Sequence, residues 1–131
     1  MVKIFALFCV LSTNFLANAQ VDTIKCEESF TYFDTLLGEN LIVIWETPPS
    51  LQECSQKDVD KLKEFARKQM NYEYILIDMI IDSEGVPICF RFKQEIDPLI
   101  KVKLTDMLKL LRFKPALIMD KRVESIYTIK I

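Results

Sequence analysis

The stretch YILIDMIIDSEGVPICFRFK, from Tyr74 to Lys93, decides the fold because it contains two strand patterns and the turn between them. In its first half every second residue is apolar, as in a β-strand with one buried face; these residues are Ile75, Ile77, Met79 and Ile81. The opposite side, which includes Asp78, is mixed, so we expect it to be half solvated or partly covered. The segment Asp82–Gly85 supplies a glycine for the positive φ of a short loop, so the stretch predicts a β-hairpin.

The return strand of this hairpin is expected over Val86–Lys93. Its alternation predicts one apolar face, made of Val86, Ile88, Phe90 and Phe92. Pro87 cannot donate a hydrogen bond to a strand ladder. We therefore expect either an edge strand or a strand that begins at this proline.

Two helices and a last strand complete the expected domain. Asp97 is a suitable N-cap and Pro98 is tolerated in the first turn, so a core helix is expected from here to the region before Pro115. An earlier helix is expected from Ser55, where Ser55–Asp58 has the pattern of a capping-box variant. The terminal run Val123–Ile131 alternates like a strand. The sequence thus predicts an α+β fold, with a small antiparallel sheet of three to four strands and two helices packed on one face.

The order hairpin, helix, basic-aromatic motif and closing strand resembles the C-terminal domain of the TonB energy-transducer family. The resemblance covers roughly residues 57 to 131. The residues that carry it are the run that follows the apolar helix and two hairpin positions: Arg112, Phe113, Lys114, Pro115, Ala116, Asp82 and Gly85.

This resemblance implies a function for the terminal strand. In the family, that strand lies at the edge of the sheet and pairs with an extended segment of an outer-membrane receptor, a form of β-augmentation. The corresponding partner-binding positions here are Glu124, Ile126, Thr128 and Lys130. The alternatives are that the strand only completes its own sheet, with charged residues protecting the edge, or that edge strands of two copies pair in a structural or assembly homodimer.

The N-terminal region predicts export. Residues 1–19 combine Lys3, an apolar run over Ile4–Leu11 and the small-residue motif Ala17-Asn18-Ala19, which is typical of a cleaved signal peptide. We expect no membrane span after cleavage, because Ser12, Thr13 and Asn14 interrupt the apolar run. The predicted location is therefore periplasmic or secreted. Transducers of the resembled family also need a membrane anchor and a long proline-rich spacer. Here the expected signal peptide is cleaved and the only proline cluster is Pro48-Pro49. The resemblance therefore implies the binding module alone.

Residues 20–54 are expected to form an N-terminal extension before the TonB-like domain of residues 55–131. Glu28–Leu37 fits a helix or a strand, and Leu41–Trp45 is a short apolar run typical of a strand. The aromatic residues Phe30, Tyr32, Phe33 and Trp45 are expected either to line a ligand groove or, more commonly, to pack in the core.

The cysteines beyond the signal sequence are Cys26, Cys54 and Cys89. In an exported protein a pair of them is expected to form a disulfide, and we expect Cys26 with Cys54 because both lie in the turn-rich N-terminal part. The other interpretations are that all three are reduced or buried, or that Cys89 is a reactive thiol beside Arg91 and Lys93.

Composition narrows the function classes. The 131 residues contain no histidine, which removes Ser-His-Asp and Cys-His catalysis and most mixed zinc sites. The formal net charge is −2, and no basic run indicates a nucleic-acid partner. We therefore expect a non-enzymatic protein with no catalytic residues, cofactor, metal or nucleic-acid partner, whose partner is a protein or peptide.

Overall fold

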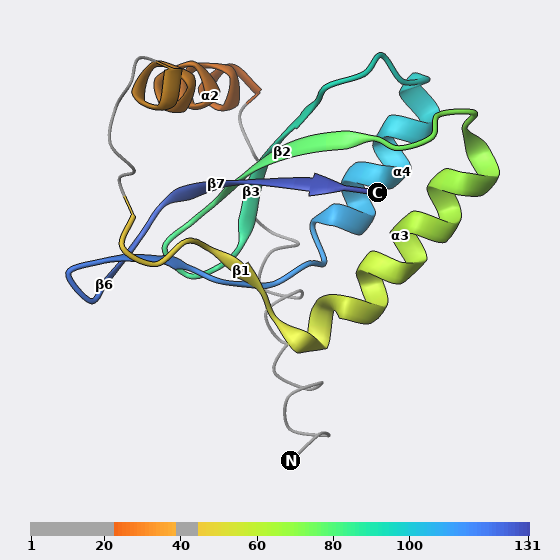
Figure 1. Ribbon diagram of the computed structural model, residues 1–131. Coiled ribbons are helices and arrows are strands. Elements are labelled where there is room, and N and C mark those ends of the chain that lie inside the picture. Colours follow the sequence, from red (N-terminus) through yellow and green to blue (C-terminus); the bar gives the residue numbers. More distant parts are fainter. Residues whose placement is uncertain (1–22, 39–44) are drawn as a thin grey trace.

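A three-stranded antiparallel sheet forms the centre of the molecule (Figure 1). The computed structural model describes residues 23–38 and 45–131. The strand order is β3-β2-β7, with β2 at Leu76–Ile81, β3 at Pro87–Phe92 and β7 at Ser125–Lys130. The predicted hairpin and terminal strand are confirmed. Pro87 is the first residue of β3, which is an edge strand, so both expectations for the proline hold.

The hairpin turn is fixed by one aspartate and one glycine. An Asp82 carboxylate oxygen accepts hydrogen bonds from the Glu84 and Val86 amides, each at 2.9 Å. Gly85 has φ +84°, which L side chains rarely adopt. A Cβ at this position would lie 1.9 Å from the Phe113 carbonyl oxygen, because the Phe113 amide donates to the Gly85 carbonyl at 2.8 Å. The turn therefore docks tightly on the segment that follows the second helix.

Helices α3 (Gln56–Gln69) and α4 (Pro98–Leu108) pack on one face of the sheet (Figure 1). Together with β2 they build the main core, whose fully buried members include Leu62, Ile77, Met79, Leu104, Leu108 and Phe113. Asp97 caps α4 as expected, since its side chain accepts from the Leu99 amide at 2.9 Å. The mixed α+β architecture predicted from the sequence is therefore confirmed.

The start of α3 differs from the predicted capping box. Ser55 is the N-cap residue, but its side chain makes no cap hydrogen bond. Its hydroxyl oxygen instead accepts the Arg112 amide at 2.7 Å. Ser55 is fully buried, so its hydroxyl satisfies a buried backbone group on another segment rather than the end of its own helix.

Short strands extend the end of the domain beside the hairpin turn. β1 (Ser50–Leu51) pairs with β4 (Phe113–Lys114), and Thr47 bridges to Leu117. β5 (Ala116–Ile118) and β6 (Lys121–Val123) form a second hairpin, with Met119 and Asp120 both at positive φ as in a two-residue turn. A 3-10 turn, η1 (Glu53–Ser55), leads into α3. Of the expected strand Leu41–Trp45, Leu41–Ile44 lie outside the described residues, and Trp45 belongs to no strand.

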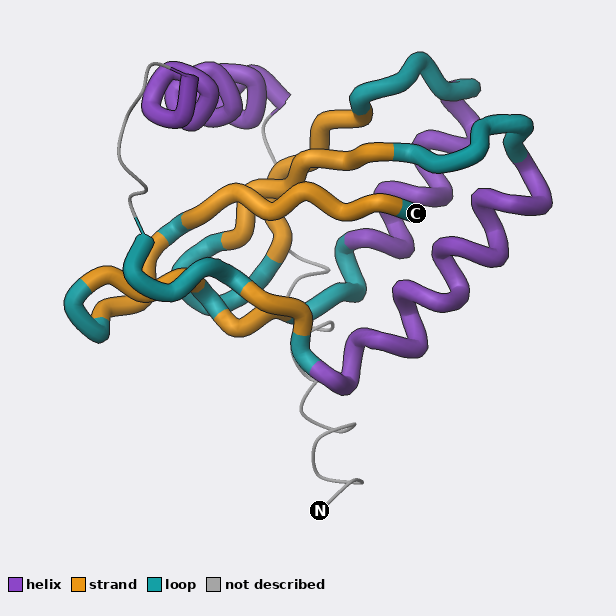
Figure 2. Tube along the Cα trace, viewed as in Figure 1, coloured by secondary structure: helices purple, strands orange, loops and turns teal. Residues whose placement is uncertain are grey.

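Helix α2 (Thr23–Gly38) covers the other face of the sheet (Figure 2). Its Cys26, Phe30 and Phe33 follow helical spacing and form a second, smaller buried cluster with Ile80 and Cys89. Of the two expectations for Glu28–Leu37, helix is therefore correct. The described part of the N-terminal extension packs against the rest of the domain through α2 and β1. The expected signal peptide lies outside the described residues.

Candidate functional site

The outer side of β7 is an unpaired strand edge. Within residues 23–38 and 45–131, β7 pairs only with β2. Beyond the end of β7, Ile75 and Ile131 exchange two backbone hydrogen bonds, at 2.9 and 3.0 Å. Hydrogen-bonded and non-hydrogen-bonded pairs alternate along an antiparallel ladder, so Ile129 and Tyr127 also direct their backbone groups toward β2.

The intervening residues have the opposite orientation. Lys130, Thr128 and Ile126 pair with Leu76, Asp78 and Ile80 as non-hydrogen-bonded partners. Their N–H and C=O groups therefore point away from β2. Three of the four positions expected to bind a partner thus present their main chain at the open edge, which a further strand can extend.

The side chains of these same residues point to the α2 face and contact the protein itself. Ile126 packs against the small cluster under α2. The Thr128 hydroxyl donates to Asp78 at 2.7 Å, and the Lys130 ammonium lies 4.5 Å from the centre of the Tyr74 ring. Glu124, the fourth position, directly precedes β7 and is exposed. Apart from Glu124, the edge therefore offers main chain, while its side chains on this face support the fold.

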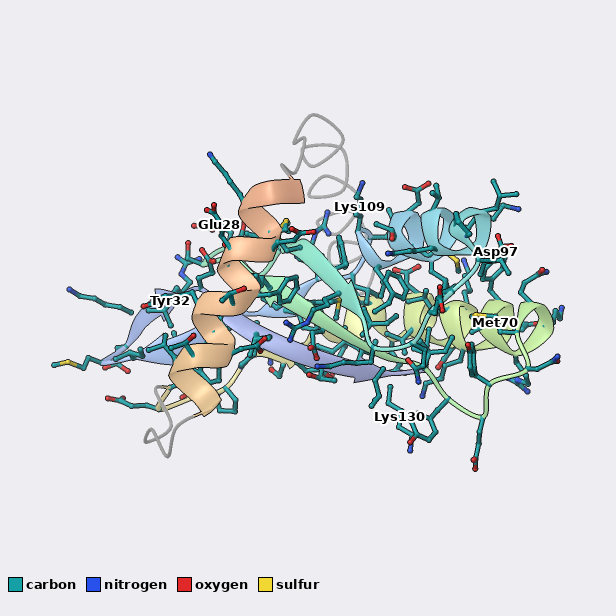
Figure 3. All side chains as sticks on the ribbon, turned by 90° about the horizontal axis from the view of Figure 1, so that it is seen from above. Glu28, Tyr32, Met70, Asp97, Lys109 and Lys130 are labelled. Carbon is teal, nitrogen blue, oxygen red and sulfur yellow. A yellow bond between two sulfur atoms is a disulfide. The ribbon has the colours of Figure 1, made fainter. Side chains whose placement is uncertain are left out.

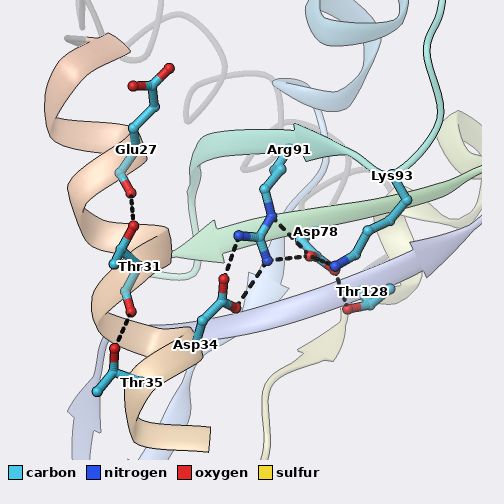
Figure 4. Close-up of polar contacts among 8 residues, drawn as sticks. All are labelled: Glu27, Thr31, Asp34, Thr35, Asp78, Arg91, Lys93 and Thr128. Carbon is cyan, nitrogen blue, oxygen red and sulfur yellow. Dashed lines mark hydrogen bonds and ion pairs between the residues drawn. The ribbon is translucent and has the colours of Figure 1, made fainter. Parts of the chain in front are cut away.

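An ion-pair network centred on one buried carboxylate lies beside this strand on the α2 face (Figure 4). The Asp78 carboxylate is only 4% exposed and contacts the Lys93 ammonium at 2.7 Å and an Arg91 nitrogen at 2.8 Å. Arg91 also holds Asp34 of α2 with two hydrogen bonds, at 2.6 and 3.0 Å, and its guanidinium lies 4.7 Å from the centre of the Phe30 ring. The network therefore fastens α2 to β3.

The geometry sets the direction of each pKa shift. Burial raises the pKa of Asp78, but hydrogen bonds from Lys93, Thr128 and Arg91 outweigh burial, so the pKa lies below its usual value. The hydrogen bond from Arg91 lowers the pKa of Asp34, and the same contact raises the pKa of Arg91. Asp78, Asp34 and Arg91 are therefore charged at neutral pH.

A disulfide joins Cys26 to Cys89, not Cys26 to Cys54, so the predicted pairing is wrong. Helix α2 lies across the sheet and brings the Cα atom of Cys26 to 5.5 Å from that of Cys89, within the usual range for a disulfide. The sequence argument failed because it paired cysteines by position along the chain, before the location of α2 was known. The sulfur of Cys89 is bonded, so it is not the reactive thiol of the alternative interpretation.

The motif residues that carry the family resemblance meet at the junction of α4 and β4. Arg112 is 3% exposed, and its Nη1 donates to the carbonyls of Lys109 and Leu111 at 2.8 and 2.7 Å. Burial lowers the pKa of Arg112, against the charges of Asp82 and Asp58. Phe113 is fully buried, with its ring centre 4.8 Å from that of Tyr127. Lys114 is exposed, Pro115 is half-buried and Ala116 is fully buried.

These motif residues fasten the hairpin turn to the exit of α4. Asp82 and Gly85 shape the turn, and the Phe113 amide binds the turn by donating to the Gly85 carbonyl. They position the start of β4 and, through Tyr127, contact β7. Their role in the site is to support the edge strand, since none of them is on the open edge itself.

The aromatic residues considered for a groove divide between two roles. Tyr32, Phe33 and Trp45 line a groove of about 510 Å³ together with Glu28, Ser29, Leu36, Ile118 and Glu124. Phe30 instead lies buried beneath Arg91. Sequence reasoning named Glu124 as a partner-binding position but did not join it to Glu28, because the two residues are far apart in the chain and line one groove only when α2 folds onto the sheet.

Two further properties concern the described residues as a whole. None of their helices is both long and apolar enough to cross a membrane. Among them, no group of three or more cysteine, aspartate or glutamate residues is placed to hold a metal ion.

Comparisons with protein-family models, with curated proteins and with solved structures each returned no match. The TonB-like interpretation therefore stays a prediction from the residues themselves.

Proposed function

We propose that this chain is an exported, non-enzymatic binding module, whose open β7 edge pairs with an extended peptide such as a segment of an outer-membrane receptor. The observation that carries the proposal is the outward orientation of the backbone groups of Ile126, Thr128 and Lys130. Strand addition at such an edge gains affinity from main-chain hydrogen bonds and specificity from neighbouring pockets.

Two other features support this function. The motif Arg112–Ala116 with Asp82 and Gly85 resembles the TonB C-terminal domain, in which the corresponding strand meets receptors. The signal-peptide pattern of residues 1–19 supports export, and in a two-membrane bacterium an exported module would meet such receptor segments in the periplasm.

The test is a proline scan of the outward-facing positions. Because the amides of Ile126 and Lys130 do not bond to β2, proline there removes an edge donor without removing a bond of the β2–β7 ladder. Peptides are first selected from a displayed random heptapeptide library against the wild-type protein. We expect Ile126→Pro and Lys130→Pro each to weaken binding of the selected peptides at least about tenfold, whereas Ile126→Ala and Lys130→Ala, which keep the amides, retain most of it.

Equal affinities for the proline and alanine variants would refute edge pairing. Light scattering of the protein without peptide tests the alternative of self-association. A homodimer that the same proline variants dissociate would assign the edge to a second copy of the chain.

A further inference from the structure

The groove beside α2 has a composition that suits a cation. Glu28, Tyr32 and Phe33 reach it from α2, and Trp45 and Glu124 reach it from the other side. Figure 3 shows Glu28 and Tyr32 on the side of α2 that faces away from α3 and α4. The described residues that line the groove include two carboxylates and no lysine or arginine.

Both kinds of lining group attract positive charge. The faces of tyrosine, phenylalanine and tryptophan rings attract ammonium and guanidinium groups, and carboxylates add charge-assisted hydrogen bonds. Glu124 is exposed as a whole residue, but partial desolvation of its carboxylate and the charge of Asp82 raise its pKa. The nearby Arg122 is directed to Glu84 at 3.4 Å. An alkyl chain that ends in a cation suits both the apolar side chains of the groove and its two carboxylates, Glu28 and Glu124.

The groove adjoins the open edge of β7. Glu124 lines the groove and directly precedes Ser125, the first residue of β7. A strand added beside β7 would lie about 4.8 Å from it, within reach of a lysine or arginine side chain. A side chain on the α2 face of such a strand would extend toward the groove.

We propose that the groove of Glu28, Tyr32, Phe33, Trp45 and Glu124 receives a lysine or arginine side chain of the peptide that pairs with β7. This inference rests on the proposed function, because the peptide is the partner assigned to the edge. It adds the specificity: main-chain pairing holds the peptide, and the groove selects a basic residue at one position of it.

Trp45 allows a direct test because it is the only tryptophan in the chain. Its fluorescence is titrated with N-acetyl-lysine amide and, at matched ionic strength, with the uncharged N-acetyl-norleucine amide. We expect a saturable fluorescence change whose apparent dissociation constant is about two- to fivefold lower for the lysine compound, the ratio expected of an exposed cation–π contact. The double variant Glu28→Gln/Glu124→Gln keeps the shape of both side chains and is expected to remove the difference. Equal responses to both compounds in the wild-type protein would overturn the inference.

The edge variant separates this result from that of the proposed function. Lys130 is at the opposite end of β7 from Glu124, so Lys130→Pro should keep the lysine response of Trp45 while weakening the selected heptapeptides. Those heptapeptides should carry a lysine or arginine at a fixed position, and norleucine there should weaken binding about as much as the double glutamine variant does. Selected peptides whose binding Lys130→Pro weakens, but which contain no lysine or arginine, would support edge pairing. They would overturn the assignment of the groove to a basic side chain. A lysine response in a protein that selects no peptide would refute the edge, and with it this assignment of the cation to a strand partner.

Discussion

Asp78 shows how one residue links the three strands of this small sheet to α2. Its position in β2 exposes it to the α2 face, and there the carboxylate accepts from Thr128 of β7 and pairs with Arg91 and Lys93 of β3. A buried carboxylate is costly unless its charge and lone pairs are satisfied. Here the partners come from both neighbouring strands and, through Arg91, from Asp34 on α2.

We expect Asp78→Asn to lower the free energy of unfolding by about 3 kcal/mol at pH 7, because two cations lose their shared partner. The pKa of Asp78 is lowered in the folded state, so its contribution is fully present above the unfolded pKa of about 3.9 and is lost as pH falls through the folded pKa. Urea unfolding should show a larger difference between wild type and variant at pH 7 than near pH 3, where part of the contribution of Asp78 is lost. Glu84→Gln, which removes an exposed ion pair at 3.4 Å, is the matched control, with an effect under about 1 kcal/mol.

Gly85→Ala tests the contact between the hairpin turn and β4. A side chain at φ +84° is strained by about 1–3 kcal/mol, and the added Cβ would also overlap the Phe113 carbonyl oxygen. We expect the variant to lose more than 2 kcal/mol of unfolding free energy, a threshold at the middle of that strain range. Ser83→Ala, at an exposed position of the same turn, should be close to neutral by the same denaturation measurement. Similar stabilities for the two variants would contradict the tight docking.

At the scale of elements, the sequence predicted those whose evidence is local. The alternation of Ile75–Ile81, the turn glycine and the Asp97 cap each depend on a few neighbouring residues, and each is found as expected. Ile88 was predicted to share a face with Phe90 and Phe92, but the register shifts between Ile80 and Ile81, and Ile88 packs on the α2 side.

The location of α2 was beyond sequence reasoning. Cys26, Phe30 and Phe33 show that the helix has an apolar face, but not which surface receives it. The disulfide partner of Cys26, the cover over Asp78 and the carboxylates of the groove all depend on that one placement. From the sequence, β7 was predictable only as a terminal strand. Which of its amides face outward could not be predicted, because that depends on the register with β2.

The disulfide should account for much of the attachment of α2. Cys26 and Cys89 are 63 residues apart, and closing a loop of this length contributes about 4 kcal/mol in the chain-entropy model. We expect Cys26→Ser/Cys89→Ser to lose stability on that order and to raise amide hydrogen exchange in α2 far more than in α3 or α4. Uniformly faster exchange in all three helices would show instead that α2 and the main core unfold as one unit.

At the scale of the whole molecule, the sheet is covered on both faces, and its long edges carry the unpaired main chain. The main cluster lies between β2 and the pair α3 and α4, and the smaller one lies under α2. Removing α2 should therefore leave the main cluster in place, but it would expose the apolar surface of the smaller cluster.

A chain that begins at Trp45, with Cys89→Ser, should keep the circular dichroism of α3, α4 and the sheet because the main cluster contains no residue of α2. It should bind the dye ANS and associate at micromolar concentration, since Ile80, Ile88 and Ile126 lose their cover. Light scattering and dye fluorescence measure both effects. A monomer that binds no dye would show that this face does not need α2.

The strand register of β7 has a consequence for how such a protein can diversify. Ile126, Thr128 and Lys130 direct their side chains to intramolecular contacts on the α2 face, while their amides and carbonyls face the open edge. Substitutions at these three positions would therefore mainly change the stability of the fold. Every amino acid except proline would present the same backbone N–H and C=O groups to a pairing peptide. New preferences among ligands would have to arise beside the strand, in the walls around Trp45, where substitutions leave the ladder untouched.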